Sequence, residues 1–311
     1  MERRASLTVE PLPGMPGAGG GCRARRWPTR RGRVARALRG LLLSLWVSGA
    51  AAADGAATGG PLRAAALPLQ SREATVREFS KLFRAVGEAV GRPVEFVYLD
   101  RYEAVLDDLL AGRLDVAYLG PMPYVELMRR NPEAASPLVR FREADGSSTY
   151  RCALVSFPDN PLRWPDVAGS RLAMPQALST CGPHSAGPLL ARLGGPRLDV
   201  MKTHFSGQHE IVAQQVVAGH ADLGTLKQSV ATAYRVLGLR ILATTDPLPG
   251  FLLVVRNAAM PVAQRGLLRE RLMAWPTQAQ RQWGKSVRWG LEPASDADYD
   301  TLRALAKAGP P

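Results

Sequence analysis

Residues 109–119, "LLAGRLDVAYL", align without a gap on residues 216–226, "VVAGHADLGTL", at a separation of 107 positions. Each copy has the pattern of a helix end, an Ala-Gly stop, a short turn, an aspartate and a buried strand with a small residue after its first apolar position. The two stretches therefore predict that one α/β unit occurs twice in the chain.

The same separation relates two earlier pairs of segments. "VEFVYLDRYEAVLDD" (94–108) aligns on "MKTHFSGQHEIVAQQ" (201–215), and "AAALPLQSREATV" (64–76) aligns on "RLAMPQALSTCGP" (171–183). Each copy then has the order strand, loop, helix, strand, loop, helix, strand, which is a βαβαβ unit with parallel strands. The alternative is chance similarity between generic α/β units, and it accounts poorly for three ungapped matches at one separation.

Two such units predict an α/β fold of two lobes whose polar loops, at the carboxyl ends of the strands, face each other. Residues 145–160 and 239–257 are rich in β-forming residues and are predicted to be the two strands that cross between the lobes. The first lobe is then formed by residues 62–145 plus 251–311, and the second by residues 146–250.

The last part of the chain, residues 271–308, is predicted to be helical and to pack back on the first lobe.

Most of the positive charge precedes these units. The net charge is +13, and residues 1–53 contribute +8 of it through ten arginines against two glutamates, so the remainder carries only +5. A basic stretch, the apolar run "LLLSLWVSG" and small residues follow one another there, as in a secretory signal peptide cleaved after Ala53. A disordered basic tail is the alternative. We expect a periplasmic protein that does not bind nucleic acid.

The predicted mature chain contains two cysteines, Cys152 and Cys181. We expect two free thiols, because nothing in the spacing resembles a disulfide scaffold. A single disulfide is the alternative in an oxidising compartment.

The loop "ALSTCGPHSAG" (177–187) is the main candidate for binding chemistry. It opens a predicted helix, where unpaired backbone N–H groups and the helix dipole favour an anion. The hydroxyls of Ser179 and Thr180 add donors, and Gly182 allows a ligand to approach the backbone closely. The alternative is an ordinary Ser/Thr helix cap.

Four more residues are candidates for contact with the same ligand. His209 opens the next helix of the second lobe and is expected to donate to an oxyanion, while Tyr124 and Gln70 belong to first-lobe loops. Asp222, in "AGHADLGTL", is expected to orient a histidine or accept from a protonated ligand oxygen. Its repeat counterpart, Asp115, leaves a purely structural role open.

Motifs of catalysis and metal binding are missing from the sequence. There is no G-x-S-x-G elbow, no H-E-x-x-H cluster and no glycine-rich phosphate loop of the nucleotide enzymes. We therefore predict no enzymatic activity, no cofactor and no metal. A secreted hydrolase that uses Cys181 with a histidine stays as the alternative, although short sequence spacing is no evidence for a catalytic pair.

Five segments, in this order, resemble the periplasmic binding proteins of the phosphonate, phosphite and phosphate ABC transporter family. They are "LDVAYLGPMPYVEL", "DGSSTYRCALV", "STCG", "FSGQHEIVAQQVVAGHADLG" and "DPLPGFLLVVR". The resemblance runs from about Arg63 to Tyr299. It implies a type II periplasmic-binding-protein fold, capture of a small phosphorus oxyanion by hinge closure, and delivery to an ABC permease in the inner membrane. A sensor subunit that signals to a membrane kinase is the alternative, and a monomer is expected.

The resemblance also implies roles for individual residues. Ser179, Thr180 and Cys181 would hold ligand oxygens, and His209 and Asp222 would complete the wall of the second lobe. From the first lobe or the crossing strand, Tyr124 and Tyr150 would approach. One position departs from the family: where a third hydroxyl is usual, this chain has Cys181, a weak donor.

Overall fold

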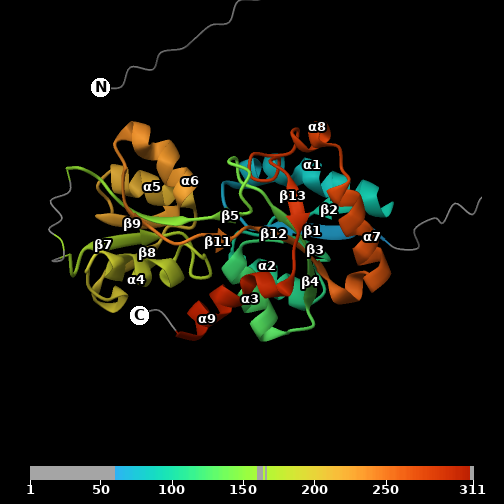
Figure 1. Cartoon of the computed structure of the whole chain (residues 1–311), viewed down its shortest axis with the longest axis horizontal. Helices are drawn as coiled ribbons and strands as arrows, with labels where there is room; N and C mark the ends of the chain where they lie inside the picture. The colour runs from blue at the N-terminus through green and yellow to red at the C-terminus, as the bar shows by residue number, and fades with distance from the viewer. Residues whose placement is uncertain (1–59, 160–163, 165–166, 309–311) are drawn as a thin grey trace, which may run out of the picture. The chain divides into compact units, whose positions relative to one another are not determined.

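The structure is a computed structural model that describes residues 60–159, 164 and 167–308, without the side chains of residues 307 and 308. It has a mixed α/β fold built on two main sheets (Figure 1). The predicted leader, residues 1–53, lies outside the described residues.

The first main sheet has six strands. They are β1 (Leu62–Ala66), β2 (Val94–Phe96), β3 (Val116–Leu119), β4 (Ala135–Phe141), β12 (Leu252–Arg256) and β13 (Leu291–Pro293). Their order across the sheet is β13-β4-β12-β3-β1-β2. β1 pairs in parallel with β2 and β3, in the register Leu62 to Val94 and Ala64 to Val116, and the other pairs are antiparallel.

The second main sheet has five strands. They are β6 (Cys152–Ser156), β7 (Arg171–Met174), β8 (Lys202–Phe205), β9 (Leu223–Lys227) and β10 (Arg240–Thr244). Their order is β10-β6-β9-β7-β8, in which β7 is parallel to β8 and β9 while β6 is antiparallel to β9 and β10.

The helices follow the strands as the repeat predicts. They are α1 (Arg72–Val90), α2 (Tyr102–Leu110), α3 (Pro121–Arg130), α4 (Pro183–Arg192), α5 (His209–Val217), α6 (Gln228–Ala233), α7 (Val262–Met273), α8 (Thr277–Gln280) and α9 (Asp300–Ala308). Both ends of α2 and α5 differ by 107 positions, the separation found in the sequence. The parallel strand orders β2-β1-β3 and β8-β7-β9 are also equivalent, so the predicted duplication is confirmed.

A short antiparallel ribbon joins the two sheets. Its strands are β5 (Thr149–Tyr150) and β11 (Leu248–Pro249), which pair with Tyr150 opposite Leu248. β5 precedes β6 and β11 precedes β12, so each crossing segment supplies the antiparallel neighbour of β9 or β3 in the next sheet (Figure 1). We propose that the two lobes follow these sheets, with residues 62–145 plus 251–311 as the first and 146–250 as the second.

Helices cover both faces of the second sheet because side chains of a strand alternate between the faces. Ala153 and Val155 of β6 belong to the apolar cluster that also includes Val212 of α5. Leu154, between them, belongs to the cluster that includes Leu189 of α4. This sheet therefore has a helical layer on each side.

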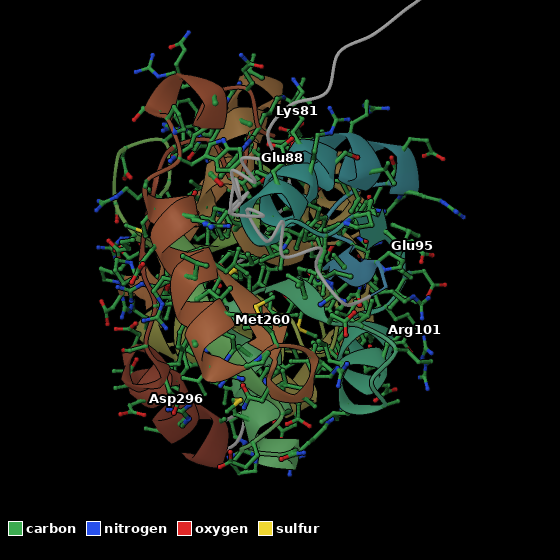
Figure 2. The ribbon with its side chains drawn as sticks, turned by 90° about the vertical axis from the view of Figure 1, so that its right-hand side faces the viewer. Lys81, Glu88, Glu95, Arg101, Met260 and Asp296 are labelled. Carbon is green, nitrogen blue, oxygen red and sulfur yellow. A yellow bond between two sulfur atoms is a disulfide. The ribbon has the colours of Figure 1, made fainter. Side chains whose placement is uncertain are left out.

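In the first lobe α1 has one apolar face and one charged face. Ser71 caps its start by accepting from the N–H of Ala74, and Gly91, at φ 68°, ends it in the left-handed conformation that glycine tolerates best. Phe79 and Leu82 are buried in the core, whereas Lys81 and Glu88 point outward from the helix (Figure 2).

The C-terminal segment differs in part from the prediction. It packs on the first lobe as expected, α7 against α1 and α9 against α3. It is not wholly helical, however, because Leu291–Pro293 form β13, which extends the sheet by pairing with β4. A strand of three residues is too short to leave a period-2 pattern in the sequence.

Candidate functional site

A small cavity lies where the carboxyl ends of parallel strands from the two sheets meet. Its free volume is about 10 Å³, space for about one water molecule, so its own lining residues nearly fill it. Its lining residues are Leu67, Tyr102, Gly120, Pro123, Tyr150, Ser179, Thr180, Cys181, His209, Lys227 and Phe251. Five of the eight predicted site residues are among them: Tyr150, Ser179, Thr180, Cys181 and His209.

The Ser179–Thr180–Cys181 turn is held by its own backbone. The N–H of Ser179 donates to the carbonyl of Gln176 (2.9 Å), and the N–H of Gly182 donates to the carbonyl of Ser179 (2.9 Å). A side chain at position 182 would not fit, since a Cβ there would lie 2.8 Å from the carbonyl oxygen of Gln176. A compact turn ahead of α4 follows from this arrangement.

Three donors of this turn have no protein partner among the described residues. They are the backbone N–H groups of Thr180 and Cys181 and the hydroxyl of Ser179. All three residues are buried and line the cavity. Donors at the start of a helix that are withheld from water favour an anion in the cavity.

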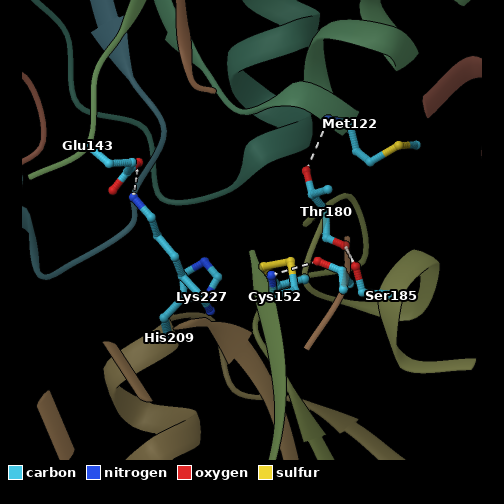
Figure 3. The surroundings of a disulfide bond; sticks show 9 residues. Met122, Glu143, Cys152, Thr180, Ser185, His209 and Lys227 are labelled. Atoms are coloured by element: carbon cyan, nitrogen blue, oxygen red, sulfur yellow. Dashed lines mark hydrogen bonds and ion pairs between the residues drawn. A yellow bond between two sulfur atoms is a disulfide. The ribbon is translucent and has the colours of Figure 1, made fainter. Parts of the chain in front are cut away.

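The Thr180 hydroxyl reaches the opposite lobe. Its Oγ1 accepts from the N–H of Met122 (3.1 Å), in the first turn of α3 (Figure 3). The carbonyl of Thr180 accepts from the Ser185 hydroxyl (2.6 Å), which ties the turn to α4. Thr180 thus joins the start of one helix to the start of another.

A second bond between the lobes involves residues that the sequence analysis missed. The N–H of Tyr102, at the start of α2, donates to Oε1 of Gln176 (3.0 Å), and Nε2 of Gln176 donates to the carbonyl of Gly207 (3.2 Å). A signal was present, because Tyr102 is the repeat counterpart of His209 and so begins the equivalent helix.

His209 is buried at the start of α5, and Nδ1 of its ring accepts a hydrogen bond from the protein. Nδ1 accepts from the backbone N–H of Lys227 (3.1 Å), the last residue of β9. Burial, with a smaller effect of the Lys227 charge, lowers the pKa of His209 to about 3. A neutral ring that accepts at Nδ1 carries its proton on Nε2, which is then the nitrogen that can donate to a ligand.

Lys227 places a formal positive charge on the cavity wall, which the sequence analysis did not predict. Its Nζ donates to Oε1 of Glu143 (2.7 Å) and lies 5.4 Å from the ring centroid of Tyr150 and 5.3 Å from that of Phe251 (Figure 3). Its position at the carboxyl end of β9 was the available signal, because ligands bind at that end of parallel strands.

Tyr150, on the connecting ribbon, completes the wall. Burial raises the pKa of its phenol, against the effect of a hydrogen bond with the side chain of Thr180. The hydroxyl is therefore protonated at every physiological pH and remains a hydrogen-bond donor.

Three predicted site residues do not line the cavity. The hydroxyl of Tyr124 donates to Oδ1 of Asp296, and its ring packs against Tyr299, on the side of the C-terminal segment. Gln70 precedes the cap of α1, and its carbonyl accepts from the Thr75 hydroxyl. Neither residue is among those that line the candidate cavity.

Asp222 lies at the wrong end of its strand for ligand contact. It precedes β9, and its carboxylate accepts from the backbone N–H and guanidinium of Arg171 at the start of β7. Asp115 does the same in the first lobe, where its carboxylate accepts from the N–H of Arg63. The amino ends of the parallel strands lie at the sheet edge opposite the cavity. Asp222 therefore has the structural role of holding the start of a neighbouring strand, as Asp115 does.

The prediction of two free thiols is wrong. Cys152 and Cys181 form a disulfide, with their Cα atoms 5.2 Å apart (Figure 3). The sequence analysis compared only their spacing, whereas the strand order β6-β9-β7, with β6 antiparallel to β9, brings the start of β6 to the same sheet edge as the loop after β7. Cys181 therefore has no S–H to donate, and only its backbone N–H can bind a ligand oxygen.

Within the described part of the chain no three His, Cys, Asp or Glu side chains gather in a way that would hold a metal ion. Nor does any helix there have the length and apolar character needed to cross a bilayer.

Known proteins resemble this chain along most of its length. Residues 64–299 match the family described as "ABC transporter, phosphonate, periplasmic substrate-binding protein". The phosphate-import protein PhnD of Mycolicibacterium smegmatis is 23% identical over 267 residues, which cover 77% of this chain and 83% of that protein.

Two solved structures share the fold. PhnD1 of Prochlorococcus marinus, solved with methylphosphonate, is 15% identical with a TM-score of 0.68, covering 79% of this chain and 97% of that one. The binding protein of an ABC phosphonate transporter from Pseudomonas aeruginosa is 16% identical with a TM-score of 0.69, covering 79% and 85%.

Proposed function

The chain belongs to the family of periplasmic substrate-binding proteins of phosphonate ABC transporters, and on this premise we propose that its cavity captures a small phosphorus oxyanion, either a phosphonate, phosphite or phosphate. Solute capture for an ABC transporter is the work of this family. The proposal concerns which solute is captured, which residues hold it and how it is released.

The observation that carries the proposal is the turn at Ser179, whose residues line the cavity and hold three donors without a partner among the described residues. Each oxygen of a phosphoryl group accepts hydrogen bonds from N–H and O–H donors, and two consecutive backbone N–H groups match a pair of such oxygens. The free volume of about 10 Å³ means that the lobes must part to admit a ligand, and so small a site favours a ligand with a small organic substituent or none.

The charge of the wall supports an anion as the ligand. Lys227 and Glu143 form one pair at the cavity, so the local charge is balanced before the ligand arrives. The anion then interacts with the ammonium group of Lys227, the neutral His209 and the Tyr150 hydroxyl rather than with an excess of cations. Such sites bind oxyanions through oriented dipoles and hydrogen bonds.

Hinge closure is the proposed mechanism of capture. The two hydrogen bonds from α2 and α3 to Gln176 and Thr180 join the lobes, and the β5–β11 ribbon connects them. A ligand that touches both lobes shifts the equilibrium toward the closed form and is shielded from water there, which strengthens its hydrogen bonds. A membrane permease would then recognise the closed form of a monomer.

Chemistry on the ligand is not proposed. A hydrolase would require a thiolate at Cys181, and the disulfide leaves none. The family works outside the cytoplasmic membrane, and we propose that residues 1–53 form a signal peptide that directs export to the periplasm. A disulfide agrees with an oxidising compartment.

A panel of ligands tests the proposal by thermal unfolding and by calorimetric titration. Phosphate, phosphite, methylphosphonate and aminoethylphosphonate are compared with sulfate, each in excess over the protein. A ligand at about 100 times its Kd stabilises the folded form by ~2.7 kcal/mol and raises Tm accordingly. No shift with any phosphorus oxyanion, together with no titration heat, would contradict the proposal.

A further inference from the structure

The disulfide connects the proposed ligand turn to the hinge of the molecule. Cys181 is the third residue of the turn and lines the cavity. Cys152 is the first residue of β6 and follows Tyr150 of the ribbon by two positions. The covalent bond therefore runs from the ligand site to the point where one connecting strand enters the second lobe.

Cys152 is itself fixed to the other connection between the lobes. Its N–H donates to Oγ1 of Thr245 (3.1 Å), and its carbonyl accepts from the N–H of Thr245 (2.9 Å). Thr245 directly follows β10 and precedes the ribbon strand β11. Cys181 is thus covalently attached to the point where the two connecting segments are hydrogen-bonded to each other.

The geometry of the turn matters because its two unpartnered N–H groups belong to Thr180 and to Cys181 itself. Local hydrogen bonds hold Ser179 and Gly182, on either side of these two residues. The peptide plane that contains the Cys181 N–H is held on one side by the Ser185 hydroxyl, which donates to the Thr180 carbonyl, and on the other by the Cys181 sulfur, which is bonded to Cys152.

The geometry points to a positioning role for the Cys152–Cys181 disulfide: it aims the backbone N–H groups of the turn at the anion. The disulfide thereby makes up for the side-chain hydroxyl that position 181 lacks. This inference rests on the proposed function. Reduction frees the turn, so that the anion must itself order the backbone of Cys181 when it binds. Ordering about one residue costs enough to weaken binding about tenfold.

The burial of the two sulfurs adds a second consequence. Cys152 is 0% exposed and Cys181 is 1% exposed, so a reductant reaches them only when the lobes open. Reduction breaks the Sγ–Sγ bond: a dithiol supplies two electrons and two protons, two cysteine thiols form, and the sulfurs of the dithiol join as its own disulfide. A ligand that keeps the lobes closed should therefore protect the bond.

The first experiment uses one protein in two redox states. Cys22 is replaced by alanine in all samples, so that thiols counted by maleimide labelling come from this pair. The oxyanion of highest affinity in the ligand panel is titrated calorimetrically against oxidised, dithiol-reduced and reoxidised protein. We expect about tenfold weaker binding after reduction, with recovery on reoxidation. Equal affinity in both states would overturn the inference.

The second experiment measures the rate of reduction with and without that ligand. With the ligand at about 100 times its Kd, the open ligand-free form falls about 100-fold, and the labelling rate should fall with it. An equal rate of reduction in both samples would mean that the ligand does not shield the bond, and that outcome would also overturn the inference.

Matched variants separate positioning from folding. In Cys152→Ala with Cys181→Ala, no covalent bond forms and no new donor lines the cavity, and we expect the weak binding of the reduced protein. Near-ultraviolet circular dichroism, measured well below Tm, establishes that each sample is folded. Wild-type affinity in the folded double variant overturns the inference, whereas an oxidised wild-type protein that binds no phosphorus oxyanion overturns the proposed function instead.

Discussion

The hydroxyl of Thr180 accepts a hydrogen bond from the backbone N–H of Met122, and this contact of 3.1 Å joins the starts of helices in opposite lobes. Thr180 also belongs to the turn whose N–H groups face the cavity. One side chain therefore takes part both in closure and in the candidate ligand site, and variants of it report on the two together.

Replacing Thr180 with valine keeps the shape of the side chain and removes its hydroxyl. We expect anion affinity to fall by about 2- to 10-fold, since the hydrogen bond from Met122 that joins the lobes is lost and a neutral hydrogen bond contributes ~0.5–1.5 kcal/mol. Calorimetric titration measures the change. Thr225→Val is the matched control: Thr225 is also fully buried, but its Oγ1 has no partner among the described residues, so its loss should leave affinity unchanged and stability unchanged or higher.

Lys227 and Glu143 should affect binding with opposite sign. Lys227→Met removes the positive charge from the cavity wall and leaves the Glu143 carboxylate without its cation, so affinity should fall by at least about tenfold. Glu143→Gln releases the ammonium group for the ligand, so affinity should rise and depend more on salt. Titrations at two ionic strengths measure both. If Glu143→Gln weakens binding as much as Lys227→Met, the pair serves closure alone.

Variants of Tyr150 and Tyr124 should distinguish a residue that lines the cavity from one that packs outside it. Tyr150→Phe removes a hydroxyl beside Thr180, and we expect a loss of affinity of about 3- to 10-fold. Tyr124→Phe removes the hydrogen bond to Asp296, so the free energy of unfolding should fall by ~1–3 kcal/mol with affinity unchanged. Urea unfolding and titration of each variant test this, and the reverse pattern would return Tyr124 to the ligand site.

His209 makes the protein less stable in acid. Its folded pKa of about 3 lies below the unfolded value of about 6.5, so between these pH values the unfolded chain binds more protons. The free energy of unfolding should therefore fall as the pH falls below 6.5, by ~1.4 kcal/mol per pH unit at most, until the pH approaches 3.

The variant His209→Asn isolates this effect, because its side-chain oxygen can accept from the N–H of Lys227 as Nδ1 does. Urea unfolding at a series of pH values from 7 to 4.5 should show a gentler decline for the variant. Parallel declines would mean that His209 does not titrate in this window.

The duplicated fold was accessible from the sequence because strands and helices in both copies keep one separation. Ser179 and Thr180 were accessible for a related reason, since a helix start after a parallel strand lies at the ligand edge of the sheet. Asp222 does not meet this condition, because it precedes its strand, as Asp115 does. Its place in the sequence, just before a strand, already predicts the opposite edge of the sheet.

Features that depend on contacts between residues far apart in the sequence were beyond the sequence pattern. The Cys152–Cys181 bond and the contact of Gln176 with Tyr102 join residues that become neighbours only when each connecting segment adds its strand to the next sheet. Tyr124 was misplaced because a tyrosine in the first turn of α3 can point to either side, and Asp296, 172 residues further on, decides the matter.

The position of β12 sets an order of assembly. β12 lies between β4 and β3 inside the first sheet, although its residues are synthesised after every strand of the second sheet. A chain that emerges from its amino end can thus complete the second sheet while the first still lacks an interior strand. Truncation near Gly250 should leave residues 146–250 protected from proteases and expose the earlier segment to cleavage.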